Sequence, residues 1–167
     1  LDYGHGEGRD RRMWLAVVND DMPFLVDTIS QIAAAQNLII HRLLHPLAYV
    51  ERGSAGHLLS ISADKGTGGQ GQRESLIFME LERVDARARR QFSDAVQVAL
   101  GDVRAAVCDW KAMRAEMLSD AAMRLDGEAA ELLRWFESGA MLLLGHEWRS
   151  RDGGRDKPLG ISAASHG

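Results

Sequence analysis

The sequence is poor in the residues that build several common kinds of site. It contains a single cysteine, Cys108, among 167 residues, which excludes an internal disulfide and a zinc site made of paired cysteines. No apolar run approaches the roughly 20 residues needed to span a bilayer. The first residues also lack the apolar core of a signal peptide. Together these absences favour a reduced, cytoplasmic setting.

An excess of positive charge is missing as well. The formal net charge is −4 and the sequence pI is about 5.9, so the chain as a whole does not attract nucleic acid or an anionic membrane. The run DARARRQ, residues 85–91, has acidic neighbours and no interleaved aromatic residues. We therefore expect it to be a solvated helix face. The hydrophobic content of 46% is enough for one sizeable core with a subdomain attached.

Four short segments in the first half of the chain have the patterns of strands. Residues 12–18 and 38–50 are apolar runs, and residues 57–63 and 74–84 alternate apolar with polar positions. Alternation is typical of a strand with one buried face. Pro46 within the second run indicates an edge or a bulge, because proline cannot donate to a strand ladder.

A helix is expected between the first two strands. Its apolar face is formed by residues spaced at i, i+4, i+7 and i+8, namely Leu25, Ile29, Ile32 and Ala33. Asp20 and Asp21 offer N-cap oxygens, and Pro23 suits the first helical turn. Asn37 is suited to end the helix in a left-handed conformation.

The second half of the chain has a helical period. One long apolar stripe runs from Phe92 to Trp110, with steps of three and four residues. Asp109 is expected to cap a new helix, and Asp126 with Gly127 to begin another. Residues 141–148 read as one more strand, whose partner is not evident in the sequence.

This order of elements predicts an α+β fold of the ferredoxin-like type, an antiparallel sheet with helices on one face. We place a tail or linker at 1–11, the α+β domain at 12–108 and a helical extension at 109–138. Residues 139–167 contain the last strand and a second polar, Gly-rich linker. Both ends have the composition of places where a longer chain was cut.

The polar residues predict neither a catalytic nor a metal site. His41 and His45 lie roughly 13 Å apart if they are on a strand, too far to share one ion. Cys108 has no histidine base nearby in the sequence, and His146 with Glu147 is an isolated pair. The Gly-rich stretch at 65–72 is followed by no helix, so it is expected to be a flexible loop rather than a phosphate site.

The turn NDDMPF, residues 19–24, joins the first strand to the first helix and allows two interpretations. It is a well-capped helix start, with the acidic side chains satisfying the free backbone N–H groups. Alternatively, those N–H groups and the positive end of the helix dipole bind an anionic group of a small molecule.

Residues Asp21, Pro23, Leu25, Asn37 and Ile39 resemble the pattern of an ACT domain, the amino-acid-sensing β-α-β-β-α-β module of metabolic enzymes. Phe24 stands where an ordinary ACT turn has glycine. The blocks NDDMPFLVDTI, HRLLHPLAYVERG, ESLIFMELERV, DVRAAVCDWKAMRAEM and LLRWFESGAMLLLGHEWR extend the likeness. In this order they are similar to the N-terminal region of the large bacterial NAD-specific glutamate dehydrogenases.

The resemblance implies a non-catalytic regulatory or oligomerisation segment. A distant catalytic domain of the same polypeptide would oxidise glutamate to 2-oxoglutarate and ammonia with NAD, and this segment itself would hold no cofactor. The implied partners are other copies of the chain, the rest of its own polypeptide and an amino-acid effector. The implied ligand residues are Asp20, Asp21, Met22, Pro23, Phe24, Asn37 and Ile39.

Two alternatives stay open beside this interpretation. The chain is a stand-alone amino-acid sensor, or it is a purely structural interaction domain. The last strand of the ACT sheet is also unassigned: either residues 141–148 supply it after a helical insertion, or the sheet is completed differently.

Overall fold

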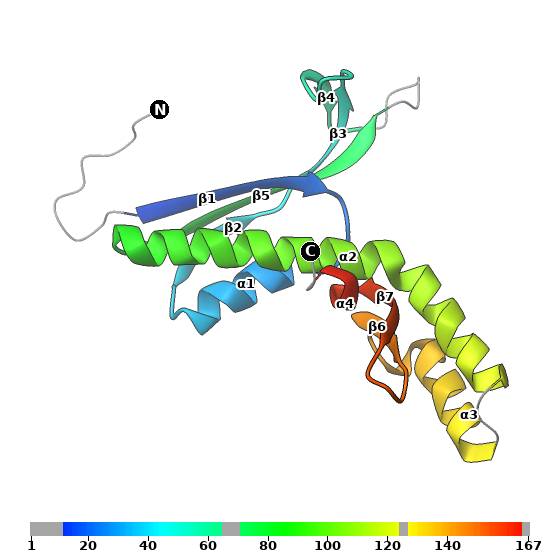
Figure 1. Cartoon of the computed structure of the whole chain (residues 1–167). Coiled ribbons are helices and arrows are strands. Elements are labelled where there is room, and N and C mark those ends of the chain that lie inside the picture. The colour runs from blue at the N-terminus through cyan, green and yellow to red at the C-terminus, as the bar shows by residue number, and fades with distance from the viewer. Residues whose placement is uncertain (1–11, 65–70, 124–126, 165–167) are drawn as a thin grey trace. The chain divides into compact units, whose positions relative to one another are not determined.

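The computed structural model describes residues 12–64, 71–123 and 127–164 (Figure 1). The chain forms two compact units, Leu1–Gln97 and Val98–Gly167. The division falls within a long helix, α2 (Ala86–Met123), and the domain boundary expected after residue 108 falls within the same helix. The predicted tail at 1–11 and most of the predicted Gly-rich loop lie outside the described residues.

The first unit is built on a five-stranded antiparallel sheet. Its strands are β1 (Arg12–Asp20), β2 (Ile40–Leu44), β3 (Leu47–Arg52), β4 (Leu58–Ser62) and β5 (Gln72–Glu82). The order is β1-β5-β3-β4, and β2 also pairs with β5. The longest strand, β5, is therefore central, with β1 on one side and β2 and β3 in succession on the other.

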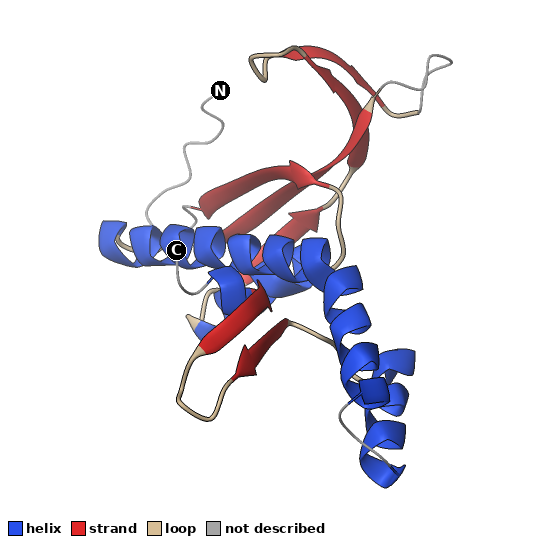
Figure 2. Ribbon diagram, turned by 45° about the vertical axis from the view of Figure 1, so that its right-hand side comes forward, coloured by secondary structure: helices blue, strands red, loops and turns tan. Residues whose placement is uncertain are grey.

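Two helices cover one face of this sheet, as Figure 1 and Figure 2 both show. They are α1 (Leu25–Ala35) and the first turns of α2. The alternation of β5 buries Ile77, Met79 and Leu81 almost completely, as predicted, and α1 buries Leu25 and Ile29. This arrangement confirms the α+β, ferredoxin-like fold class.

Two strand predictions need correction. The expected strand 38–50 is interrupted at His45 and Pro46, so that β2 and β3 are separate strands on the same side of β5. Pro46 has no N–H to give, although its carbonyl still accepts a bond of 3.0 Å from the Leu76 amide. The segment 57–63, predicted to be half-buried, is exposed along all of β4, because the β3–β4 hairpin extends beyond the helices (Figure 2).

The start of α1 also differs from the prediction. The residue that caps the helix is Phe24, no side chain makes a capping hydrogen bond, and Pro23 precedes the helix instead of lying in its first turn. The predicted capping by Asp20 and Asp21 is therefore wrong. The end of the helix was predicted correctly, since Asn37 has the left-handed φ of 56°.

The second unit consists of the rest of α2 and a small helix–hairpin assembly. Its other elements are α3 (Gly127–Trp135), the π-helical turn η1 (Phe136–Ala140), β6 (Gly145–Arg149), β7 (Arg155–Gly160) and α4 (Ile161–Ala164). Met113, Met117 and Leu143 form its buried core. Leu133, Phe136 and Leu159 pack around this core.

The helix that was expected to start at Asp109 does not exist as a separate element, because α2 continues without a break for 38 residues. The Asp109 carboxylate instead accepts a 2.8 Å hydrogen bond from the Gly160 amide. The predicted strand 141–148 corresponds to β6, and its partner is β7 in a separate two-stranded sheet. Residues 141–148 therefore do not supply the last strand of the first sheet, and the second alternative, a sheet completed differently, is the one observed. No helix among the described residues is long and apolar enough to cross a membrane.

Candidate functional site

The turn between β1 and α1 is tied to the neighbouring strand through Asp21. Its carboxylate accepts a 2.8 Å bond from the Ser75 hydroxyl and lies 3.0 Å from Nε of Arg73. Its amide donates to the Arg73 carbonyl at 3.0 Å. Ser75 is fully buried, and its hydroxyl also lies 3.0 Å from Nε2 of His45. Asp21 therefore fixes the position of the turn against β5 and does not cap the helix.

Asp20 lies beside this anchor at the end of β1. Its carboxylate accepts a 3.2 Å hydrogen bond from the Gln72 side chain. Both acidic residues of the turn are thus half-buried and have partners on β5. They keep negative charge at the start of α1, where it can receive a positively charged group such as an ammonium.

Phe24 has an unusual backbone conformation for its residue type. Its φ of 73° lies in the left-handed region, which bulky side chains rarely adopt and which costs about 1–2 kcal/mol relative to glycine. Its carbonyl accepts the first helical bond, from the Thr28 amide at 3.0 Å. Because no side chain caps α1, the first backbone N–H groups of the helix have no side-chain acceptor there.

The other two predicted site residues lie at the far end of α1. Asn37 follows the helix, and the Ile39 carbonyl accepts a 3.0 Å bond from the Glu82 amide. The eleven residues of α1 make it roughly 16 Å long at about 1.5 Å per residue. The structure therefore brings Asp20, Asp21, Met22, Pro23 and Phe24 together in one turn, and it places Asn37 and Ile39 at a separate position.

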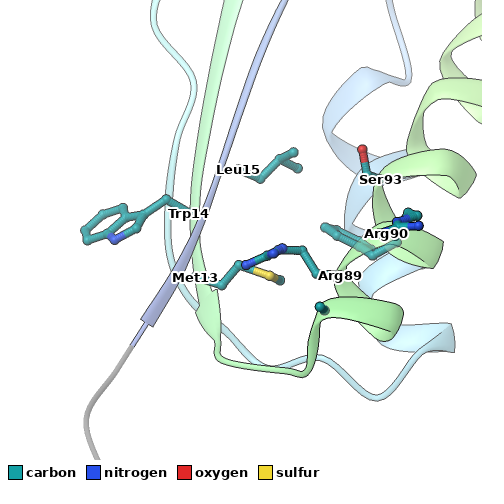
Figure 3. A pocket seen from close by; sticks show the side chains of 8 residues that line it. Met13, Trp14, Leu15, Arg89, Arg90 and Ser93 are labelled. Atoms are coloured by element: carbon teal, nitrogen blue, oxygen red, sulfur yellow. The ribbon is translucent and has the colours of Figure 1, made fainter.

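A second feature of this unit was not predicted from the sequence. A trough with a volume of about 370 Å³ lies between β1 and the first turns of α2 (Figure 3). It is lined by Met13, Trp14, Leu15, Ala86, Arg89, Arg90, Phe92 and Ser93. In Figure 3 the side chains of Met13 and Leu15 point toward α2, and Arg89 extends back toward Met13. The arginine run 87–90 contributes Arg89 and Arg90 to the trough. From the sequence, this run was interpreted as a solvated helix face.

A buried ion pair connects β3 to the central strand. Glu74 is 5% exposed and accepts two hydrogen bonds from Arg52, of 2.6 and 2.9 Å. These bonds hold the pKa of Glu74 below its usual value of 4.5, against the opposing effect of burial. They also raise the pKa of Arg52. The pair is structural, because the third guanidinium nitrogen of Arg52, Nη1, donates to the Gly56 carbonyl at 3.0 Å.

The other polar residues considered in the sequence occupy separate places. The His41 imidazole lies 2.9 Å from the Arg12 guanidinium, His45 contacts Ser75, and Cys108 is exposed on α2. His146 of β6 lies 3.6 Å from the Asp120 carboxylate. Within the described ranges, no group of three or more His, Cys, Asp or Glu residues is placed to hold a metal ion.

The comparisons with known proteins agree with the fold. The model of the family described as "Glutamate dehydrogenase, ACT1 domain" matches residues 4–96. The NAD-specific glutamate dehydrogenase of Pseudomonas aeruginosa is 29% identical over 169 residues, which cover 92% of this chain and 10% of that protein. The enzyme of the same name from Halomonas elongata is 29% identical over 158 residues, covering 87% of this chain and 10% of that protein.

The chain thus spans about a tenth of the length of the curated relatives that it matches. The family match covers more than half of the chain and coincides with the first compact unit, the one that carries the β1–α1 turn and the trough. On this basis the chain belongs to the family of the glutamate dehydrogenase ACT1 domain.

Proposed function

We propose that this chain is a non-catalytic regulatory module of an NAD-dependent glutamate dehydrogenase. The observation that carries the proposal is the pattern of coverage. About nine tenths of this chain align with only a tenth of each relative. In such a polypeptide the oxidation of glutamate to 2-oxoglutarate, and the binding of NAD, belong to other segments.

The β1–α1 turn is the proposed effector site of this module. Backbone N–H groups at the start of α1 lack a side-chain cap and suit the carboxylate of an amino acid. The neighbouring Asp20 carboxylate suits its ammonium group. The left-handed backbone at Phe24 is the type of strain that accompanies ligand-binding turns.

A structural interaction domain is the second candidate function, and a specific observation favours it. Both acidic residues of the turn already have hydrogen-bond partners on β5, namely Gln72 for Asp20 and Ser75 for Asp21. Such a turn can have a purely structural role, which is to fix α1 on the sheet. The two candidate functions differ in their response to free amino acids.

The length of the native polypeptide is the first test. An antibody against this chain would be used in immunoblots of the cells that produce it, and the reactive protein would be purified. We expect a polypeptide many times longer than 167 residues that copurifies with NAD-linked oxidation of glutamate. A native chain ending near Gly167 would refute the assignment to a dehydrogenase.

Titration with amino acids tests the effector site. A ligand at a hundredfold excess over its Kd stabilises a folded protein by about 2.7 kcal/mol, which thermal unfolding of this chain would detect. Asp20→Asn is expected to weaken the stabilisation, because it removes the charge that faces the ammonium group. Asp64→Asn, at an exposed position outside the turn, serves as the matched control. If no amino acid shifts the unfolding curve, the purely structural role is supported.

A further inference from the structure

The outer edge of β1 has the properties of a surface that pairs with another strand. Among the described residues β1 pairs only with β5. The segment from Met13 to Val18 contains no charged residue and no proline, although edge strands of soluble proteins usually carry one or the other to prevent pairing. Trp14 and Val18 are each 57% exposed. This edge is therefore long, apolar and unprotected.

The trough provides room beside this edge. Met13, Trp14 and Leu15 are consecutive in β1 and all three line it, while Figure 3 shows Trp14 pointing away from the side on which Met13 and Leu15 lie. A cavity that touches three successive strand residues runs along the strand backbone, because their side chains alternate between faces. The space of about 370 Å³ therefore lies next to the start of the β1 edge, on the side of the sheet that α2 covers.

The two ends of the edge carry opposite charge. Arg12 opens β1, and Arg89 and Arg90 line the trough beside Met13. No ion pair of Arg89 or Arg90 with another described residue is present in the structure. At the other end, β1 finishes with Asp20 and is followed by Asp21. A strand with a basic start and an acidic end complements a second strand of the same kind only when the two run antiparallel.

We propose that a second copy of this chain occupies the edge, with the two β1 strands antiparallel about a twofold axis at Ala16. In this register Arg12 lies opposite Asp20 of the second copy, and Trp14 lies opposite its Val18. The acidic end of each strand comes beside Arg89 and Arg90 of the other copy. Such a contact is isologous, so one complementary edge is sufficient for a closed dimer.

This dimer shares Asp20 with the proposed effector site, but the two proposals fail separately. Pairing covers the exposed Trp14 and Val18 side chains and satisfies the outward N–H and C=O groups of both strands. It requires no ligand at the β1–α1 turn. Failure of amino acids to bind would leave the dimer in place, and a monomeric chain would leave the effector proposal in place.

A disulfide at the twofold axis tests the register. In a Cys108→Ser background, Ala16→Cys places two thiols directly opposite each other, where the β-carbons of facing residues lie about 4.5–5.5 Å apart. We expect rapid formation of a linked dimer on a non-reducing gel. Val18→Cys is the control on the same strand, because its thiol would face Trp14 of the second copy. Equal linkage of both variants, or linkage of neither, would overturn the proposed register.

Sedimentation equilibrium of the whole chain tests the surface itself. Val18→Lys puts a charge opposite Trp14 of the second copy and should weaken association roughly tenfold or more. Ile61→Lys makes the same change at a position of β4 with nearly equal exposure, 56% against 57%, and should have no effect. A chain that stays monomeric at every concentration contradicts the proposal, as does a dimer that only Ile61→Lys disrupts.

Charge reversal tests the dimer a second time without changing the apolar segment of β1. Arg89→Glu combined with Arg90→Glu, both at exposed helical positions, should weaken the dimer by placing like charges beside Asp20 of the second copy. Asp20→Lys alone should also weaken the dimer, because it places like charges opposite Arg12 and beside Arg89 and Arg90 of the second copy. If neither charge reversal weakens association, the antiparallel arrangement is wrong.

Discussion

Glu74 of β5 and Arg52 of β3 form a two-point ion pair in which Nε donates to Oε1 at 2.6 Å and Nη2 donates to Oε2 at 2.9 Å. The carboxylate is buried, and the Arg52 side chain is 40% exposed. Arg52 is the last residue of β3, and Glu74 lies opposite Ala48 of that strand. The pair therefore ties the β3 end of the β3–β4 hairpin to the central strand.

The pair makes the stability of the first unit depend on pH in the acid range. Because the pKa of Glu74 is lower in the folded state than its usual 4.5, the pair contributes stability above pH 4.5. That contribution is lost as the pH falls through the lowered folded pKa. Glu74→Gln should reduce the free energy of unfolding at pH 7 by about 1–3 kcal/mol, the cost of a disrupted buried charge-assisted bond.

The measurement is urea unfolding of both proteins between pH 7 and pH 3. The difference between Glu74→Gln and the unsubstituted chain should shrink as the pH falls. Glu82→Gln on the same strand is the control, since the Glu82 carboxylate makes no ion pair with a described residue, and it should leave the curve unchanged. A difference that stays constant down to pH 3 would show that charge is not the cause.

The left-handed backbone at Phe24 leads to a prediction about two substitutions. Phe24→Gly and Phe24→Ala both remove the aromatic ring, but only glycine adopts a φ of 73° without strain. We expect the glycine variant to be more stable than the alanine variant by about 1 kcal/mol. This order is the reverse of the one expected in a regular helix. Thermal unfolding of the two variants compares them directly, and an alanine variant of equal or greater stability would contradict the backbone assignment.

Much of the first unit could be predicted from local patterns. The alternation of Ile77, Met79 and Leu81 and the helical spacing of Leu25 and Ile29 depend on which face of each element is buried, and the sequence carries this information directly. The left-handed end at Asn37 was predicted for the same reason, because the preference belongs to the residue itself.

The errors arise where a residue has a partner far away in the sequence. Asp21 has the chemistry of a helix cap, but Arg73 and Ser75 of β5 bind its carboxylate. Asp109 has the same chemistry and is bound by the Gly160 amide. The partner of β6 was missed because β7, with the sequence RDKPLG, has no alternating pattern. The trough depends on how α2 lies against the edge of β1, which no local pattern encodes.

Gly160 at the end of β7 leads to the last prediction. Its φ is 60°, and a β-carbon built there would lie 2.3 Å from the Leu144 carbonyl oxygen and 3.1 Å from Sδ of Met113. A backbone carbonyl cannot move aside cheaply, so Gly160→Ala should separate β6 from β7. We expect a loss of about 2–4 kcal/mol in the stability of the second unit.

Gly153 supplies the matched control for this prediction. It also has a positive φ, 87°, but a β-carbon there would meet no atom within 4 Å. Gly153→Ala should therefore cost only the conformational term of about 1 kcal/mol. Guanidinium unfolding of both variants in a Trp14→Phe background, followed through tryptophan fluorescence, reports on the unit concerned, because Trp110, Trp135 and Trp148 all belong to it. If the two substitutions cost the same, the close approach of Gly160 to Leu144 does not contribute, and the left-handed backbone alone explains the glycine.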